Sequence, residues 1–279
     1  MRINKDTTKG LFLFVTPLLT GWCVATSPTL AATLASSEAR VNLENFSHNP
    51  IGVETFTDTS TQAIGTTGQV TADADANALF ITEGLDLPTQ ASNTSFSTVQ
   101  GEGSRYFGLA QSLAAVIGYN FMVGANETFS FDFAGFLSLQ TSIDSPKFEQ
   151  AKAEGEISLQ LFDTTDSNNW RPLDFLTVSG KLVSLGEGDF LDANESASIT
   201  FNPNKTSFER SFGGNQELAT ASVEGKFSRS FDSLTYLTLV EAKTNRAIVQ
   251  PVPESSNLVA LLFFCLISVG YGVKRFASP

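Results

Sequence analysis

Apolar side chains recur at every second position along several stretches of the chain. Phe129, Phe131 and Phe133 alternate with polar residues, and the same pattern recurs over residues 156–161 and 237–240. Successive side chains of a β-strand point to opposite faces, so each stretch predicts a strand with one apolar face. Strands of this kind are typical of antiparallel sheets that pack on one side only. This alternation constrains the fold more than any other feature of the sequence.

Turn-forming residues separate the alternating stretches. Gly, Asn, Asp and Pro gather at five places: 124–126, 166–169, 186–189, 202–204 and 213–215. Short strands with such turn signals between them are typical of β-sandwiches and barrels. We therefore predict an all-β domain over residues 32–250, an antiparallel β-sandwich or jelly roll. Its stability would come from burial of apolar side chains, including many of the chain's 24 phenylalanines.

Several segments fit this pattern less clearly. Residues 104–119 have apolar side chains at helical spacing, but two glycines there weaken a helix, and we favour a strand. Residues 149–154 are compatible with a single helical turn or a loop. Residues 55–78 and 86–104 are rich in Ser, Thr, Gly, Ala and Asp, which predicts long loops, weak edge strands or partly disordered segments.

The predicted domain lacks cysteine. Cys23 and Cys265 are the only cysteines, and both lie in the terminal segments. A disulfide framework, a thiolate metal site and a cysteine nucleophile are thereby excluded from the domain. The single histidine, His48, precedes Asn49 and Pro50 in an expected turn, which argues against a multi-histidine metal site and a Ser-His-Asp triad.

The same region is strongly acidic. Residues 32–251 contain 12 Lys and Arg against 27 Asp and Glu, which leaves a net charge of −15. A nucleic-acid-binding protein needs a basic surface, so we expect no nucleic-acid partner. The sequence also has no nucleophile elbow, phosphate-binding loop or zinc-protease motif, so we expect no catalytic residues and no enzymatic activity.

Oxygen-rich segments and one tryptophan are the candidate ligand contacts. Residues 73–77 open like an EF-hand loop, but Ala78 and Gly84 occupy the positions where that loop needs Gly and Glu. Residues 163–169 form a second oxygen-rich segment, whose simpler interpretation is a solvated turn. We assign no metal ligands and expect no cofactor, with Ca²⁺ bound outside an EF-hand as the alternative. Trp170 is a candidate for stacking on a glycan, and its simpler interpretation is a tryptophan that covers the end of the core.

The N-terminus has the three parts of a secretory signal peptide. Basic residues within the first nine positions precede the apolar stretch 11–19, and a small-residue stretch follows. Cleavage is expected between Ala31 and Ala32, so residues 1–31 form the predicted signal peptide. An uncleaved N-terminal anchor is the alternative.

The C-terminus reads as a single membrane-crossing helix. Residues 257–273 are uncharged, and Lys274 and Arg275 follow directly. A helix over residues 258–273 would be about 24 Å long, slightly short of a hydrocarbon core of about 30 Å. The basic pair would stay on the cytoplasmic side and so fix the orientation. The exported domain would then lie on the opposite side of the membrane.

This tail resembles the PEP-CTERM sorting signal of Gram-negative bacteria, in which a Pro-Glu-Pro motif precedes a transmembrane stretch and a basic end. The matching motif is Val252-Pro253-Glu254-Ser255, with Ser255 in place of the second proline. The resemblance covers residues 252–279 only. It implies that the sorting segment 251–279 is recognised by an exosortase-type membrane protease after passage through the secretion translocon, and that the chain is cut near Pro253 and Glu254. A plain anchor that is never cut is the alternative.

Together, these features predict the location of the protein more clearly than its reaction or ligand. We expect an exported protein, held in the inner membrane as a precursor and then moved to the cell surface or extracellular matrix. Proteins with such tails accompany exopolysaccharide systems, so the resemblance implies a non-enzymatic structural or interaction role near surface polysaccharide. The alternative is a carbohydrate- or calcium-binding adhesin module, and an extracellular hydrolase is the third choice.

Overall fold

The computed structural model describes residues 32–82, 88–186 and 188–252. The expected signal peptide, the motif residues 253–255, the expected helix 257–273 and the basic pair that follows it all lie outside the described residues. Within the described part of the chain, no helix is long and apolar enough to cross a membrane.

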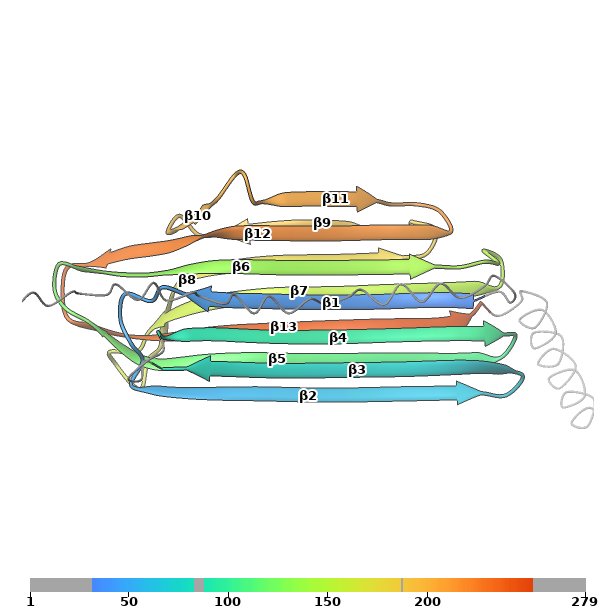
Figure 1. Cartoon of the computed structure of the whole chain (residues 1–279), viewed down its shortest axis with the longest axis horizontal. Helices are drawn as coiled ribbons and strands as arrows, with labels where there is room; N and C mark the ends of the chain where they lie inside the picture. Colours follow the sequence, from blue (N-terminus) through green and yellow to red (C-terminus); the bar gives the residue numbers. More distant parts are fainter. Residues whose placement is uncertain (1–31, 83–87, 187, 253–279) are drawn as a thin grey trace, which may run out of the picture. The chain divides into compact units, whose positions relative to one another are not determined.

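Thirteen strands form two antiparallel sheets in the described residues (Figure 1). The seven-stranded sheet has the order β10 (Ile199–Phe201), β12 (Gln216–Phe231), β6 (Glu127–Ser142), β1 (Ala32–Glu44), β4 (Gln90–Gly103) and β3 (Gly68–Ile81), and β11 (Ser207–Ser211) also pairs with β12. The six-stranded sheet has the order β2 (Gly52–Gly65), β5 (Tyr106–Val123), β13 (Thr235–Pro251), β7 (Glu149–Asp163), β8 (Arg171–Val183) and β9 (Phe190–Glu195). The predicted all-β, antiparallel character is confirmed.

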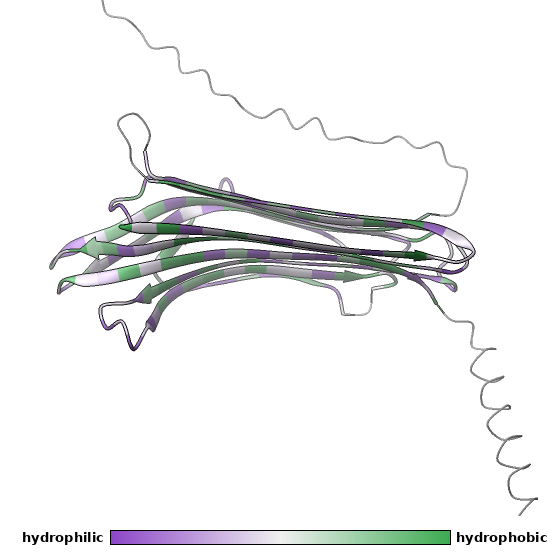
Figure 2. Ribbon diagram, turned by 90° about the horizontal axis from the view of Figure 1, so that it is seen from below, coloured by the Kyte–Doolittle hydropathy of each residue, from purple (hydrophilic) through white to green (hydrophobic). Residues whose placement is uncertain are grey.

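The two sheets pack face to face, and apolar and polar residues alternate along their strands (Figure 2). The large apolar cluster between them is rich in phenylalanine. Phe129, Phe131 and Phe133 are at most 2% exposed, as their alternation predicts. Phe129 packs against Phe121 with ring centroids 4.9 Å apart, and Phe131 stacks on Phe227 at 5.1 Å. Each such buried side chain stabilises the fold by about 1.5–3 kcal/mol relative to an exposed one.

A second, smaller apolar cluster is built mostly from alanine and valine, including Ala35, Val99 and Val249. Eight buried polar side chains lie between the two clusters, and we call them the buried polar layer. They are Ser37, Asn93, Ser95, Ser97, Ser112, Glu241, Lys243 and Asn245. They come from the neighbouring strands β1 and β4 of one sheet and β5 and β13 of the other.

The segments that were harder to interpret are all strands. Residues 104–119 mostly fall within β5, so the preference for a strand is confirmed. The helical turn or loop expected over 149–154 is wrong, because β7 begins at Glu149 and buries Ala151 and Ala153 on its inner face. The Glu149 carboxylate accepts hydrogen bonds from the backbone of the preceding loop, at 2.9 Å each, which fixes the start of the strand.

The Ser- and Thr-rich segments form β2, β3 and β4. Of the expectations stated for them, edge strands fit β2 and β3, which end their respective sheets. Long loops and disorder are wrong for the described residues of these segments. β4 is not an edge strand, because it pairs with β1 on one side and β3 on the other. Its small inward side chains, such as Ser95 and Ser97, are buried in the polar layer.

The first and last described strands begin and end beside the same loop. The backbone nitrogen of Ala32 donates to the Asp144 carboxylate at 2.9 Å. The backbone nitrogen of Val252 donates to the carbonyl of Phe148 at 2.8 Å. Both acceptors lie in the connection between β6 and β7. The described domain therefore starts and finishes at one end of the sheets.

Candidate functional site

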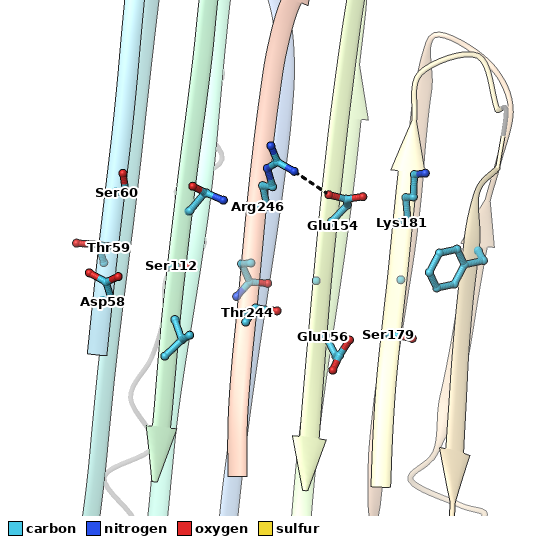
Figure 3. Close-up of a pocket in the computed structure, with 16 residues that line it drawn as sticks. Asp58, Thr59, Ser60, Ser112, Glu154, Glu156, Ser179, Lys181, Thr244 and Arg246 are labelled. Atoms are coloured by element: carbon cyan, nitrogen blue, oxygen red, sulfur yellow. Dashed lines mark ion pairs between the residues drawn. The ribbon is translucent and has the colours of Figure 1, made fainter. Parts of the chain in front are cut away.

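A groove of ≈ 550 Å³ crosses the outer face of the six-stranded sheet, from β2 to β9 (Figure 3). Polar and charged side chains from five strands line it. They include Asp58, Ser60, Gln111, Thr244, Arg246, Glu154, Glu156, Ser179 and Lys181. A volume of this size lies within the range typical of ligand sites.

Two glycines lie opposite one another beneath the groove. Gly155 of β7 pairs with Gly180 of β8 in the sheet register, and both point inward. A Cβ atom on Gly155 would lie 2.6 Å from Leu137 Cδ1 and 2.8 Å from Ser37 Oγ, so a larger residue would have to displace these side chains. The glycines therefore let the six-stranded sheet lie close against its partner, and the groove lies on the outer side of this close approach.

The neighbours of these glycines supply charge to the groove. Glu154 lies 2.6 Å from Lys152 and 3.7 Å from Arg246, measured between the charged atoms. The Nε atom of Arg246 is buried and has no hydrogen-bond partner among the described residues. Glu156 and Lys181 form no ion pair within the described part of the chain. The groove thus presents donors and acceptors that the protein itself leaves available.

An aromatic ring lies at the β9 side of the groove. Phe190 is 39% exposed and lines the same hollow as the polar side chains. An exposed ring next to hydrogen-bonding groups suits a ligand with both apolar and hydroxyl-bearing faces.

Trp170, the predicted glycan contact, lies outside this groove. It is 47% exposed in the turn between β7 and β8, and its ring centroid is 6.0 Å from that of Phe162. Asp163, at this turn, lies eight positions along β7 from Gly155, a distance of about 26 Å at 3.3 Å per residue. The contact with Phe162 agrees with the simpler interpretation, in which the indole covers the end of the core.

His48 fastens a turn at one end of the sheets. Its Nε2 atom is 3.2 Å from a Glu127 carboxylate oxygen, and its Nδ1 atom is 2.9 Å from the Ser47 hydroxyl. Glu127 also accepts a hydrogen bond from the Gly124 backbone at 2.8 Å. The pKa of the Glu127 carboxyl is below its usual value. The hydrogen bond from the Gly124 backbone is the larger cause, and the contact with His48 is the smaller one. These contacts join the segment that holds His48 to the start of β6.

The oxygen-rich segments do not form a metal cage in the described residues. Asp73, Asp75 and Asn77 lie along the outer face of β3, with successive side chains about 6.6 Å apart. Asp166 accepts a hydrogen bond from the backbone of Asn168 at 3.0 Å, as in a self-capped turn. Among the described residues, no group of three or more His, Cys, Asp or Glu side chains is arranged to hold a metal ion.

Comparison with models of protein families, with curated proteins and with solved structures finds no match to this chain. The groove is therefore interpreted from its own geometry. Of the residues expected at the processing sites, Ala32 opens β1 and Val252 follows β13, whereas Ala31 lies outside the described residues.

The sequence did not single out the groove residues. With 27 acidic side chains in the domain, pairs such as Glu154 and Glu156 carry little information by themselves. A usable signal was the pattern around the glycines, since Gly155 is flanked by two acids, and Gly180 is flanked by Ser179 and Lys181. An inward glycine between outward polar residues on adjacent strands marks the base of the hollow.

Proposed function

We propose that this is an exported surface or matrix protein whose β-sandwich domain binds an extended surface polysaccharide along the groove of the six-stranded sheet. The observation that carries the proposal is the groove itself. It crosses several strands and includes one exposed aromatic ring. It also contains the carboxylates of Asp58 and Glu156 and the ammonium group of Lys181, which form no ion pair within the described residues.

The chemistry of the lining suits a polyhydroxyl ligand. Asp58 and Glu156 supply acceptors for sugar hydroxyl groups, while Lys181 and Arg246 supply donors. Phe190 offers an apolar surface for the C–H face of a sugar ring. The acidic domain argues against a polyphosphate partner such as nucleic acid.

The proposed location outside the cell rests on the two ends of the chain. Residues 1–31 would be removed on export, and the tail from 251 onward would be recognised by an exosortase-type protease at Pro253 and Glu254. All thirteen described strands fall between Ala32 and Pro251, so both cleavages would leave the domain whole. Because β1 starts and β13 ends beside the same loop, an uncleaved precursor would be held to the membrane from that end.

The binding proposal is tested with purified protein and surface polysaccharides, by calorimetry or a glycan array. Lys181→Ala and Phe190→Ala each remove one contact group from the groove, and we expect at least about tenfold weaker binding, equivalent to about 1.4 kcal/mol. Trp170→Ala is the control for Phe190→Ala, since it removes another exposed aromatic ring, which lies outside the groove. The affinity of this variant should equal that of the unaltered protein. Loss of binding in the control alone, or equal binding by all variants, would contradict the proposal.

A further inference from the structure

Three reactive side chains meet inside the buried polar layer. Lys243 and Glu241 lie on β13 and point inward, and they are 0% and 1% exposed. The Lys243 Nζ atom is 2.9 Å from one carboxyl oxygen of Glu241. The other oxygen accepts a hydrogen bond from the side-chain nitrogen of Asn93, which lies on β4 of the opposite sheet and is 2% exposed. One carboxyl group therefore holds an amine and a carboxamide on its two oxygens.

The Asn93 side chain is only partly satisfied in this arrangement. Its Oδ1 atom is buried and has no hydrogen-bond partner among the described residues. The rest of the layer is better connected: Asn245 binds the Ser95 carbonyl at 3.0 Å and the Ser37 hydroxyl at 2.5 Å. A buried acceptor without a partner costs free energy, so the Asn93 amide calls for an explanation that Asn245 does not.

Burial shifts both titratable groups of the cluster toward their neutral forms. It raises the pKa of the Glu241 carboxyl, and the effect outweighs the nearby Lys243 and Asn93. It lowers the pKa of the Lys243 amine, and the nearby Glu241 only partly offsets this. A neutral amine is a nucleophile, whereas an ammonium group is not. A protonated carboxyl group can act as a general acid.

We propose that Lys243 and Asn93 become joined by an isopeptide bond in the folded protein, with Glu241 as the acid–base group. The Nζ lone pair of Lys243 attacks Cγ of Asn93, and the Nζ–Cγ bond forms. The Cγ–Nδ2 bond then breaks. One hydrogen passes from Nζ through the Glu241 carboxyl to Nδ2, which leaves as ammonia. Glu241 ends as it began, and no oxidant or reductant is needed.

Glu241 is placed to assist both halves of this reaction. Its contact with Nζ lets it accept the proton that the attacking amine releases. Its contact with the carboxamide lets it donate to the departing nitrogen. A half-turn of the Asn93 amide would place the unpartnered Oδ1 against the protonated carboxyl oxygen, where a hydrogen bond would polarise the Cγ–O bond.

The bond would tie the centres of the two sheets together. It would close a loop of about 150 residues between β4 and β13, and crosslinks that close long loops restrict the unfolded chain most. β13 is the last described strand, so a pull on the C-terminal side of the chain would load this strand first. The domain has no cysteine and so cannot be crosslinked by a disulfide. An amide crosslink would stabilise it instead, and thiol reductants do not break an amide bond.

The test is the mass of the unaltered protein as recovered, measured under denaturing conditions with both ends identified by their terminal peptides. We expect a mass lower than that of the sequence by one molecule of ammonia. Trypsin should fail to cut after Lys243, and a branched peptide should join residues 41–105 to residues 230–246. A full sequence mass with separate peptides would overturn the proposal, and this result needs no variant.

Variants then test the assignment of each group. Glu241→Gln keeps the shape but loses the acid, and Lys243→Met loses the nucleophile, so both should retain the full mass and give no branched peptide. Lys152→Arg alters a half-buried lysine on the outer face of β7 and should keep the mass loss. A loss of ammonia that persists in Lys243→Met would place the reaction elsewhere, as in ring closure of an asparagine, and would overturn the proposal.

Discussion

The phenylalanine-rich cluster and the buried polar layer lie between the same two sheets, yet they hold the sheets together differently. Phe129 touches the rings of Phe121, Phe131 and Phe227, and none of these contacts depends on the direction of a hydrogen bond. Asn245 instead has three hydrogen bonds to two named serines. Burial of apolar area stabilises the fold broadly, whereas the polar layer fixes which strands face each other and gathers reactive groups.

The same strands run through both regions. β13 contributes Leu237 and Leu239 to the apolar cluster, and then Glu241, Lys243 and Asn245 to the polar layer. All five face inward. The difference between the regions is therefore one of residue choice at inward positions and not of a change in fold.

The largest effect on stability is expected in the apolar cluster. Phe129→Ala removes a fully buried ring and leaves a cavity, so we expect the free energy of unfolding to fall by about 3–5 kcal/mol. Phe175→Ala is the control, because this ring is 47% exposed, and its effect should stay below about 0.5 kcal/mol. Urea denaturation measures both. Similar losses in the two variants would show that the cluster is not the main source of stability.

A smaller effect is expected in the polar layer. Asn245→Ala leaves Ser37 and the Ser95 carbonyl without this partner, which should lower the free energy of unfolding by about 2 kcal/mol. Gln250→Ala breaks a single hydrogen bond to Gln150 in a less buried position and should cost less than about 0.5 kcal/mol. Thermal unfolding of the two variants side by side decides the matter. If Asn245→Ala is as stable as the unaltered protein, the hydrogen bonds of the polar layer contribute no more to stability than those at the surface.

The smallest effect concerns Glu217, a buried acid outside the polar layer. Burial raises its pKa, and nearby Asp189 adds to the shift, although Thr141 and Gly213 donate hydrogen bonds that oppose it. Because the folded state holds the proton more tightly than the unfolded state, stability falls as the pH rises through the folded pKa. At neutral pH, Glu217→Gln should therefore stabilise the protein, by less than the losses expected for Phe129→Ala and Asn245→Ala.

The gain in stability from Glu217→Gln should vanish below the ordinary pKa of glutamate. At such a pH the Glu217 carboxyl of the unaltered protein is protonated in both the folded and the unfolded state. The measurement is the unfolding midpoint of the unaltered protein and of Glu217→Gln, from neutral pH down to below the ordinary pKa of glutamate. A gain that stays the same at low pH would point to packing and not to charge.

The sequence predicted the all-β, antiparallel class, but it missed the start of β7 and β4 as an inner strand, and it did not predict what lies between the sheets. Alternation over Phe129–Phe133 and the turn signals located strands and connections, because strand side chains have a fixed period of two. The same period of two would also place Glu241 and Lys243 on the inner face of β13, because they lie an even number of residues from Leu237 and Leu239. The charged character of these residues suggests the outer face. The register of β13 with β7 is unbroken from Leu237 to Pro251, and its register with β5 is unbroken from Leu239 onward, so both residues face inward.

The groove was beyond the sequence for a different reason. It depends on which strands become neighbours, and the pairing of Gly155 with Gly180 is a property of the sheet order. Trp170 was singled out for its chemistry alone, and its place in a turn separates it from the groove. Side-chain type predicts what a residue can bind, whereas topology decides which residues bind together.

The central functional claim is that this domain is exported and released from its tail, and the mass of the protein recovered from the cell envelope and medium tests it most directly. The unaltered protein and a Pro253→Ala/Glu254→Ala variant would be compared. We expect the unaltered protein to begin at Ala32 and to lack the residues after about position 253, with the variant keeping them. An unaltered protein that still ends at Pro279 would contradict the claim and would leave a membrane-anchored domain in its place.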